Sequence, residues 1–170
     1  KDAGKWFPIR SLFTVYALQG SIALVVALPL VMSIAQPGVH VSGIGYLGIA
    51  IFSVGFVFET LGDFQLTRFK ADPSNKGKVL NTGLWRYTRH PNYFGEILLW
   101  AGLAAFGVAC FEGTELVAWV SPIFVYLLLT RVSGIPILDR RALERWGEDP
   151  DYLSYREATP TLIPRLGSRR

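Results

Sequence analysis

The chain has 170 residues, of which 51% are hydrophobic and 18% charged, and its formal net charge is +4. Ser11 to Phe58 is a run of 48 residues without a charged side chain, whereas about 20 apolar residues already cross the hydrocarbon core of a bilayer. This pattern excludes an ordinary soluble domain, a disordered chain and a disulfide-stapled module, since Cys110 is the single cysteine.

The uncharged run is too long for one membrane span and divides around Gln36–His40, where Pro and Gly together predict a turn. The expected spans cover four ranges, at about 11–35, 41–66, 92–111 and 116–133. Pro122 lies early in the fourth span and predicts a kink there. The next apolar stretch contains Gly134 and Pro136, and it either extends the fourth span or bends back at the membrane interface.

The basic residues indicate an orientation. All 17 Lys and Arg lie before the first span, between the second and third, or at and beyond the end of the fourth. Because cytoplasmic loops are enriched in Lys and Arg, both ends of the chain, a loop at 67–90 and a tail at 137–170 are expected on the cytoplasmic side. The sequence thus predicts one membrane domain over residues 1–170, an all-α polytopic helix bundle. Cytoplasmic loops account for the excess of basic residues. The expected partner is therefore a lipid bilayer, and no nucleic acid is expected.

Ionisable side chains within a span are costly and mark functional sites. Glu59 and Asp63 are four residues apart and share one face of a helix, near the polar end of the second span. Arg68 and Lys70 follow just beyond. These residues form either a charged helix end that reaches water or the wall of a ligand pocket.

The densest polar cluster is residues 83–96, GLWRYTRHPNYFGE, at the entry to the third span. A helix N-terminus favours anions, and Arg86 and Arg89 add fork-shaped donors that suit phosphate. Tyr87 and Tyr93 offer aromatic faces for a flat ring.

Asn92 and Glu96 lie one helical turn apart in the same segment, so both can face one cavity. A belt of aromatic and basic residues at the membrane interface is the alternative, but it does not explain these two residues inside the span.

The loop from Lys70 to Asn81 is basic and rich in turn-forming residues. It is either a solvated linker attracted to anionic lipid or a source of cations, from Lys70, Lys76 and Lys78, for a phosphorylated cofactor.

Arg131 stands at the end of the fourth span, and residues 137–146 after it, with Asp139 among them, have the pattern of an amphipathic helix. This helix either lies on the membrane surface or, with Tyr152 and Tyr155 of the tail, covers a ligand.

No second His or Cys accompanies His40 or His90, so no metal site is expected. The sequence contains no Gly-x-Gly-x-x-Gly, no phosphate-binding Gly-Lys-Ser/Thr loop and no nucleophile elbow. A nucleotide cofactor would therefore be held by a membrane-embedded site.

The segment Thr82–Glu96 resembles the hallmark of the steroid 5α-reductase C-terminal superfamily, and within it the bacterial branch DUF1295, a domain of unknown function. Leu61–Lys70 and Pro160–Pro164 also fit this family. The isoprenylcysteine carboxyl methyltransferases are similar too: they share Arg-His-Pro-x-Tyr-x-Gly and bind S-adenosylmethionine in the equivalent place.

The resemblance implies a multi-pass reductase of the bacterial inner membrane that uses NADPH to reduce the C=C bond of an enone in a steroid-like or other lipophilic substrate. With the patterns above, it gives the following expected cofactor-binding residues: Glu59, Asp63, Arg68, Lys70, Arg86, Tyr87, Arg89, His90, Asn92, Tyr93, Glu96, Arg131 and Asp139.

The chain departs from the family in three respects. Glu59 stands where steroid reductases have Asn, and Lys70 stands where they have Arg. The family's domain has seven spans, with its substrate-polarising Glu and Tyr in the early ones, so this chain is expected to be the C-terminal part and the catalytic acid to lie upstream. An S-adenosylmethionine-dependent methyltransferase and a non-enzymatic membrane protein that binds lipid or nucleotide are the alternatives. Substrate identity and oligomeric state stay open.

Overall fold

The computed structural model describes residues 3–34, 41–108 and 115–165, and within these ranges the regular structure is entirely helical. The all-α prediction is therefore confirmed for the described residues. The α-helices are α1 (Ala3–Ile34), α2 (Gly43–Ala71), α3 (Pro91–Val108), α4 (Val120–Leu127), α5 (Ile135–Trp146) and α6 (Pro150–Ala158). Short 3-10 turns η1 (Pro73–Asn75), η2 (Gly83–Arg86) and η3 (Glu115–Trp119) and a π-helical turn η4 (Leu128–Val132) join them.

Three segments are long and apolar enough to cross a membrane, namely Thr14–Met32, Gly43–Ala71 and Val117–Trp146. They identify a membrane protein. The third expected span, 92–111, falls on α3 and on residues outside the described ranges, and α3 is not among the three. Its first turns carry Asn92 and Glu96, which lower its apolar character. The expected turn around Gln36–His40 also lies outside the described residues.

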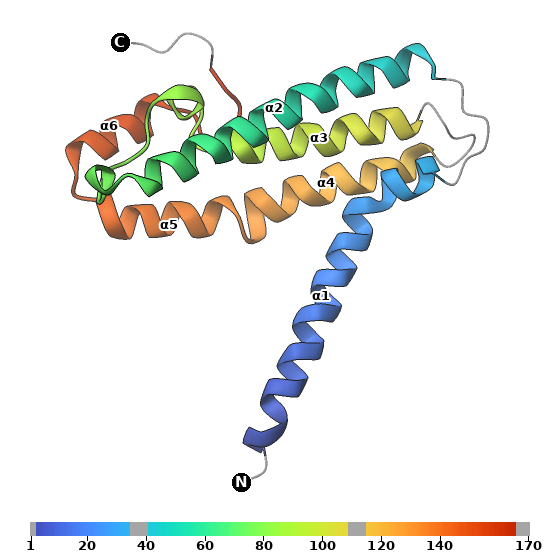
Figure 1. Cartoon of the computed structure of the whole chain (residues 1–170), viewed down its shortest axis with the longest axis horizontal. Coiled ribbons are helices and arrows are strands. Elements are labelled where there is room, and N and C mark those ends of the chain that lie inside the picture. Colours follow the sequence, from blue (N-terminus) through green and yellow to red (C-terminus); the bar gives the residue numbers. More distant parts are fainter. Residues whose placement is uncertain (1–2, 35–40, 109–114, 166–170) are drawn as a thin grey trace.

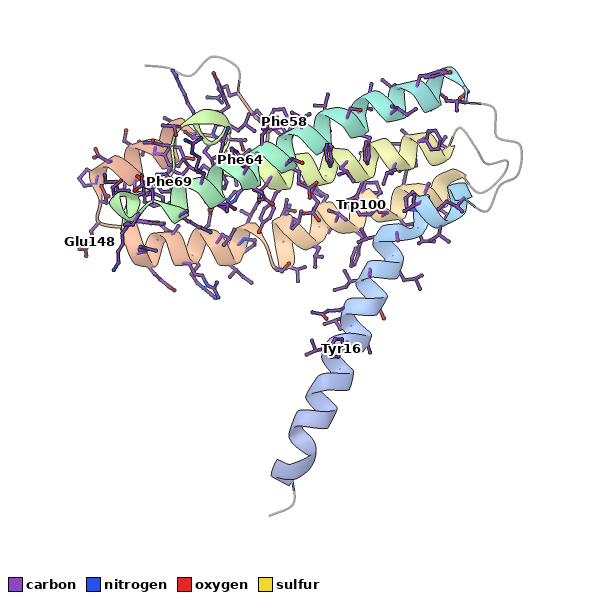
Figure 2. The ribbon with its side chains drawn as sticks, viewed as in Figure 1. Tyr16, Phe58, Phe64, Phe69, Trp100 and Glu148 are labelled. Carbon is purple, nitrogen blue, oxygen red and sulfur yellow. The ribbon has the colours of Figure 1, made fainter. Side chains whose placement is uncertain are left out.

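In Figure 1, α2, α3 and α4 run side by side, and α1 departs from them at an angle. The C-terminal part of α1 meets α4, where the Ser121 hydroxyl donates to the carbonyl of Val26 at 2.7 Å. Residues 14–21 of the protruding part are exposed, Tyr16 among them (Figure 2).

Glycines bring α2 and α3 into close contact. Gly48, Gly55 and Gly62 recur every seven residues on α2 and are all buried. A Cβ atom on Gly48 would lie 2.6 Å from the backbone nitrogen of Phe106, and one on Gly55 would lie 2.7 Å from the carbonyl oxygen of Gly95. Small residues of this kind let membrane helices approach until their backbones touch. The polar first turn of α3 is thereby fixed beside the end of α2.

The π-helical turn η4 interrupts the last long helical segment. Pro122 lies in the first turn of α4, where its missing N–H leaves no helical hydrogen bond unmade. The regular α-helix ends instead at η4, and the backbone N–H of Ser133 donates to the carbonyl of Leu128 at 2.9 Å. Beyond Gly134, α5 continues in the direction of α4 (Figure 1), so this stretch extends the segment and does not bend back.

The tail segment 160–165 runs along the residues that precede α3. The backbone N–H of Arg89 donates to Pro160, and that of Arg165 donates to Tyr87. Thr88 is fully buried, and its hydroxyl lies 2.8 Å from the carbonyl oxygen of Leu162. The tail therefore holds the entry to α3 in place. We call the end of the bundle formed by residues 63–92 and 131–165 the polar end.

Candidate cofactor site

A cavity of about 660 Å³ lies at the polar end, between the last turns of α2, the loop after it, the start of α3, and helices α5 and α6. This volume is within the range of about 300–1,000 Å³ that is usual for ligand and cofactor sites. Its wall combines cationic, aromatic and polar side chains that come from several elements.

The cationic part of the wall comes from four segments of the chain. Its members are Lys70, Lys76 and Lys78 at the end of α2 and in the loop, Arg89 before α3, and Arg145 on α5. The wall includes one carboxylate, Asp72, which caps η1 by accepting from the backbone N–H of Ser74 at 2.9 Å. That hydrogen bond lowers the pKa of Asp72, so this carboxylate stays charged without neutralising the whole wall.

The aromatic part of the wall connects the loop to the C-terminal helices. The indole N–H of Trp146, at the end of α5, donates to the carbonyl of Gly77 at 2.5 Å. The Trp146 ring lies 5.8 Å from that of Tyr152 on α6. The Tyr155 hydroxyl donates to the carbonyl of Trp85 at 2.7 Å. Burial raises the pKa of Tyr155, so its hydroxyl stays protonated and able to donate.

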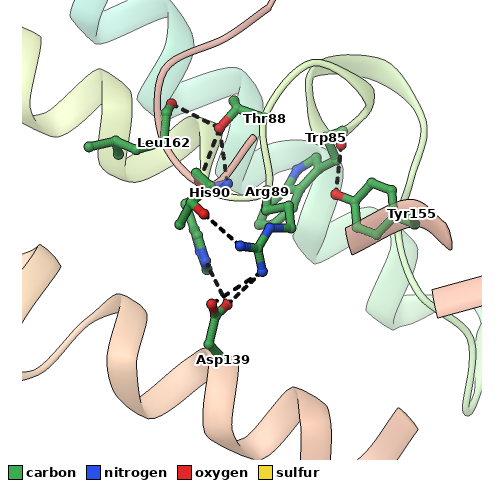
Figure 3. A network of polar contacts seen from close by, with 8 residues as sticks. Trp85, Thr88, Arg89, His90, Asp139, Tyr155 and Leu162 are labelled. Atoms are coloured by element: carbon green, nitrogen blue, oxygen red, sulfur yellow. Dashed lines mark hydrogen bonds and ion pairs between the residues drawn. The ribbon is translucent and has the colours of Figure 1, made fainter. Parts of the chain in front are cut away.

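Asp139 joins α5 to the segment before α3 (Figure 3). Its two oxygens lie 3.0 and 3.2 Å from Nη1 of Arg89, and Oδ1 lies 3.5 Å from Nε2 of His90. The other terminal nitrogen of Arg89 donates to the Thr161 hydroxyl at 2.5 Å. His90 is buried and stacks on Tyr93 with ring centroids 5.5 Å apart. One carboxylate therefore orients two of the side chains that line the cavity.

The inner part of the cavity wall contains an amide with an unused acceptor. The side-chain N–H of Asn92 donates to Oδ1 of Asp63 at 2.9 Å, whereas its Oδ1 is buried and has no hydrogen-bond partner. Glu59 and Glu96 interact electrostatically with Asp63. Asn92 is therefore a lining residue with an unsatisfied, buried acceptor, next to a cluster of carboxylates.

The expected site residues fall into three groups. Those that line the cavity are Lys70, Arg89, His90, Asn92 and Tyr93. Those that contact or interact with a lining residue are Asp63, Asp139 and Glu96, and Glu59 interacts in turn with Asp63 and Glu96. Those outside the lining are Arg68, Arg86, Tyr87 and Arg131. Arg131 lies in the π-helical turn and is exposed, and Tyr87 supplies a backbone carbonyl to Arg165.

Several lining residues were not among the expected site residues. Trp85 belongs to the dense motif before α3, but its indole N–H donates to the carbonyl of Gly62, a contact between segments that the sequence does not indicate. Leu138, Ala142 and Trp146 belong to the amphipathic pattern of residues 137–146 and line the cavity. The amphipathic pattern could have placed these three residues in the site, because one of its two interpretations was a helix that covers a ligand.

A family model described as "Protein of unknown function (DUF1295)" matches residues 1–159. The chain belongs to this family. The resemblance to DUF1295 carried by the segment before α3 is thereby confirmed.

Two curated proteins are similar to this chain. "Uncharacterized protein C594.04c" of Schizosaccharomyces pombe is 25% identical over an aligned length of 185 residues, gaps included. The alignment covers 95% of this chain and 52% of that protein. "Probable O-methyltransferase ustE" of Ustilaginoidea virens is 31% identical over 119 residues, which cover 70% of this chain and 38% of that protein. The chain thus spans about half of the first relative and less of the second. No solved structure matches it.

Proposed function

We propose that this chain is the cofactor-binding part of a membrane enzyme that uses NADPH to reduce the C=C bond of an enone in a lipophilic substrate. The charge of the cavity wall carries the proposal. The wall has more cationic side chains than carboxylates even after Asp139 neutralises Arg89. NADPH is a polyanion, whereas the sulfonium of S-adenosylmethionine is a cation, so this wall favours the dinucleotide.

The residues present fit such a cofactor. Lysine and arginine side chains suit phosphate groups, and the aromatic wall from Trp85 to Trp146 suits flat rings. The unpaired Oδ1 of Asn92 suits an amide donor such as the carboxamide of nicotinamide, since a buried acceptor without a partner costs about 1–3 kcal/mol.

When bound, NADPH supplies a hydride, and the protein supplies orientation and electrostatics. In this proposal the side chains of the basic loop hold the phosphates, and Asn92, fixed by Asp63, orients the amide end. Tyr93 and His90, stacked on each other, close the wall next to that end and keep water out. The proposal assigns no residue of this chain to protonation of the substrate.

A second candidate is an S-adenosylmethionine-dependent methyltransferase. It is favoured by the relative that is named a probable O-methyltransferase. The carboxylates of Glu59, Asp63 and Glu96, which interact with one another, would also suit a cationic sulfonium better than a phosphate.

Thermal unfolding of the purified protein in detergent separates the two candidates. NADPH, NADH and S-adenosylmethionine are each added separately. A ligand that binds the native state raises Tm, because at 100 times its Kd it stabilises that state by about 2.7 kcal/mol. We expect NADPH to raise Tm and S-adenosylmethionine to leave it unchanged. A rise with S-adenosylmethionine alone overturns the reductase proposal in favour of the methyltransferase.

A matched pair of variants tests the site. Asn92→Ala is expected to abolish the rise in Tm with NADPH while leaving the protein folded without ligand. Thr67→Ala alters an exposed residue of α2 outside the cavity lining and is expected to keep the full rise. An equal rise in both variants would refute the assignment of Asn92.

A further inference from the structure

The loop between α2 and η2 forms the outer wall of the cavity and is tightly built. The Asn75 side chain donates to the carbonyl of Phe69 at 3.1 Å, and the backbone N–H of Lys78 donates to the carbonyl of Asn75 at 3.0 Å. Gly77 has a φ of 87°, a conformation that glycine adopts easily. The loop therefore turns sharply between Lys76 and Lys78.

Trp146 fastens this turn to α5. Its indole N–H donates to the carbonyl of Gly77, the residue between the two lysines. The guanidinium of Arg145 lies 4.8 Å from the centre of the same indole ring. Lys76, Lys78 and Arg145 all line the cavity, and Trp146 contacts both Arg145 and the residue between the two lysines.

Neither lysine of the turn has an ion pair within the described parts of the chain. The charge of Asp72 interacts with that of Lys78, but the two side chains form no ion pair, and Oδ1 of Asp72 accepts from the backbone N–H of Ser74. Two lysines that line a cavity without a close counter-ion favour an anion there, and a phosphate monoester, which carries close to two negative charges, matches them.

The two parts of the cavity wall are chemically different. The inner part contains the unpaired amide oxygen of Asn92, and the outer part contains the lysine turn. Asn92 lies against Gly62 and Asp63 of α2, whereas the lysine turn follows the end of α2 at Ala71 and lines the same cavity. A dinucleotide with its amide group at Asn92 can therefore extend its adenosine half along the wall toward the lysines. NADPH differs from NADH by a single phosphate on the ribose of that half, so a cationic outer wall can discriminate between the two.

We propose that Lys76 and Lys78 bind the ribose phosphate that distinguishes NADPH from NADH, and that Trp146 positions them through its hydrogen bond to Gly77. This inference rests on the proposed function. The lysines contact the cofactor, and Trp146 acts through the loop that carries them.

The test measures the Kd of NADPH and of NADH, by titrating nicotinamide fluorescence with the purified protein in detergent. We expect the unaltered protein to bind NADPH at least tenfold more tightly than NADH. The double variant Lys76→Ala, Lys78→Ala is expected to lose at least tenfold in NADPH affinity while its Kd for NADH changes less than twofold. Replacing both lysines by arginine is expected to restore the preference.

Trp146→Phe tests the positioning role, because it keeps an aromatic ring and removes the N–H. We expect a smaller ratio of the two dissociation constants and an unchanged Kd for NADH. A merely structural role would weaken both nucleotides equally. The matched control, Arg140→Ala with Arg141→Ala, removes two exposed charges of α5 outside the cavity lining and is expected to preserve the ratio.

The outcomes separate this inference from the proposed function. If the unaltered protein binds NADH as tightly as NADPH, or the lysine variant weakens both equally, the inference is overturned while dinucleotide binding stands. If neither nucleotide binds and S-adenosylmethionine does, the proposed function falls and the inference falls with it.

Discussion

Arg89 and Asp139 are 50 residues apart in the sequence and form an ion pair, with Nη1 of Arg89 3.0 Å from Oδ1 of Asp139. The two side chains are only 11% and 24% exposed. The same carboxylate lies 3.5 Å from His90, so it joins α5 to the segment that enters α3. When one partner of a shielded pair is removed, the remaining charge is left without compensation.

Asp139→Asn is therefore expected to destabilise the protein by about 1.5–3 kcal/mol, the usual contribution of hydrogen bonds to charged groups. Thermal unfolding in detergent measures it as a lower Tm. Glu144→Gln is the control on the same helix, because its contact with Arg140 is 3.9 Å long and both side chains are about 70% exposed, and such pairs contribute about 0–1 kcal/mol. Equal effects of the two substitutions would contradict the structural role of Asp139.

Gly55→Ala is expected to destabilise the contact between α2 and α3 by about 1–3 kcal/mol, the usual cost of overpacking. The added Cβ would meet the backbone of α3, including the carbonyl of Gly95 at 2.7 Å. Gly20→Ala is the control, since a Cβ there has no atom within 4 Å. Denaturation monitored by circular dichroism compares them, and a Gly55 variant as stable as the Gly20 variant would refute close packing.

Tyr155 predicts an alkaline loss of stability. Burial raises the pKa of this phenol above its ordinary value of 10.0, so the folded state favours the neutral form. The resulting stabilisation is complete below pH 10 and is lost as pH rises beyond it, because only the unfolded phenol then releases its proton readily. Between pH 9 and pH 11, roughly one unit to each side of that pKa, Tm is expected to fall more steeply for the unaltered protein than for Tyr155→Phe. Parallel curves would show that Tyr155 titrates normally.

Thr88→Val is expected to release the tail segment 160–165. The single proton of the buried hydroxyl is shared between the carbonyls of Leu162, at 2.8 Å, and Thr161, at 3.2 Å, and a buried acceptor left unpaired costs about 1–3 kcal/mol. Limited proteolysis should cut the variant near its C-terminus faster than the unaltered protein. Thr82→Val changes an exposed threonine without a side-chain capping bond and is expected to leave the cleavage rate unchanged.

The helical character and most helix positions could be predicted from the sequence, because a long uncharged run allows few other structures. Partners could not. The seven-residue spacing of Gly48, Gly55 and Gly62 is visible in the sequence, but not that their neighbour is α3. Nor does the sequence show that Pro122 lies in the first turn of α4, although a proline is harmless in a first turn and disruptive in a helix interior.

The candidate site was predictable where its residues lie close together in the sequence. Arg89, His90, Asn92 and Tyr93 belong to one motif, and all of them line the cavity. Lining residues that the motif does not contain, such as Arg145, come from α5 and depend on tertiary contacts. Arg131 was expected in the site from its place at the end of the last span, but the π-helical turn presents it outside the lining.

The tail segment 160–165 lies just past residue 159, where the family match ends. A protein shortened at that boundary for expression would retain every helix from α1 to α6, yet the backbone of Arg89 and the hydroxyl of Thr88 would lose their acceptors. A purification tag is therefore better placed after Arg165 than in place of residues 160–165. The structural unit of this chain extends beyond residue 159, where the family match ends.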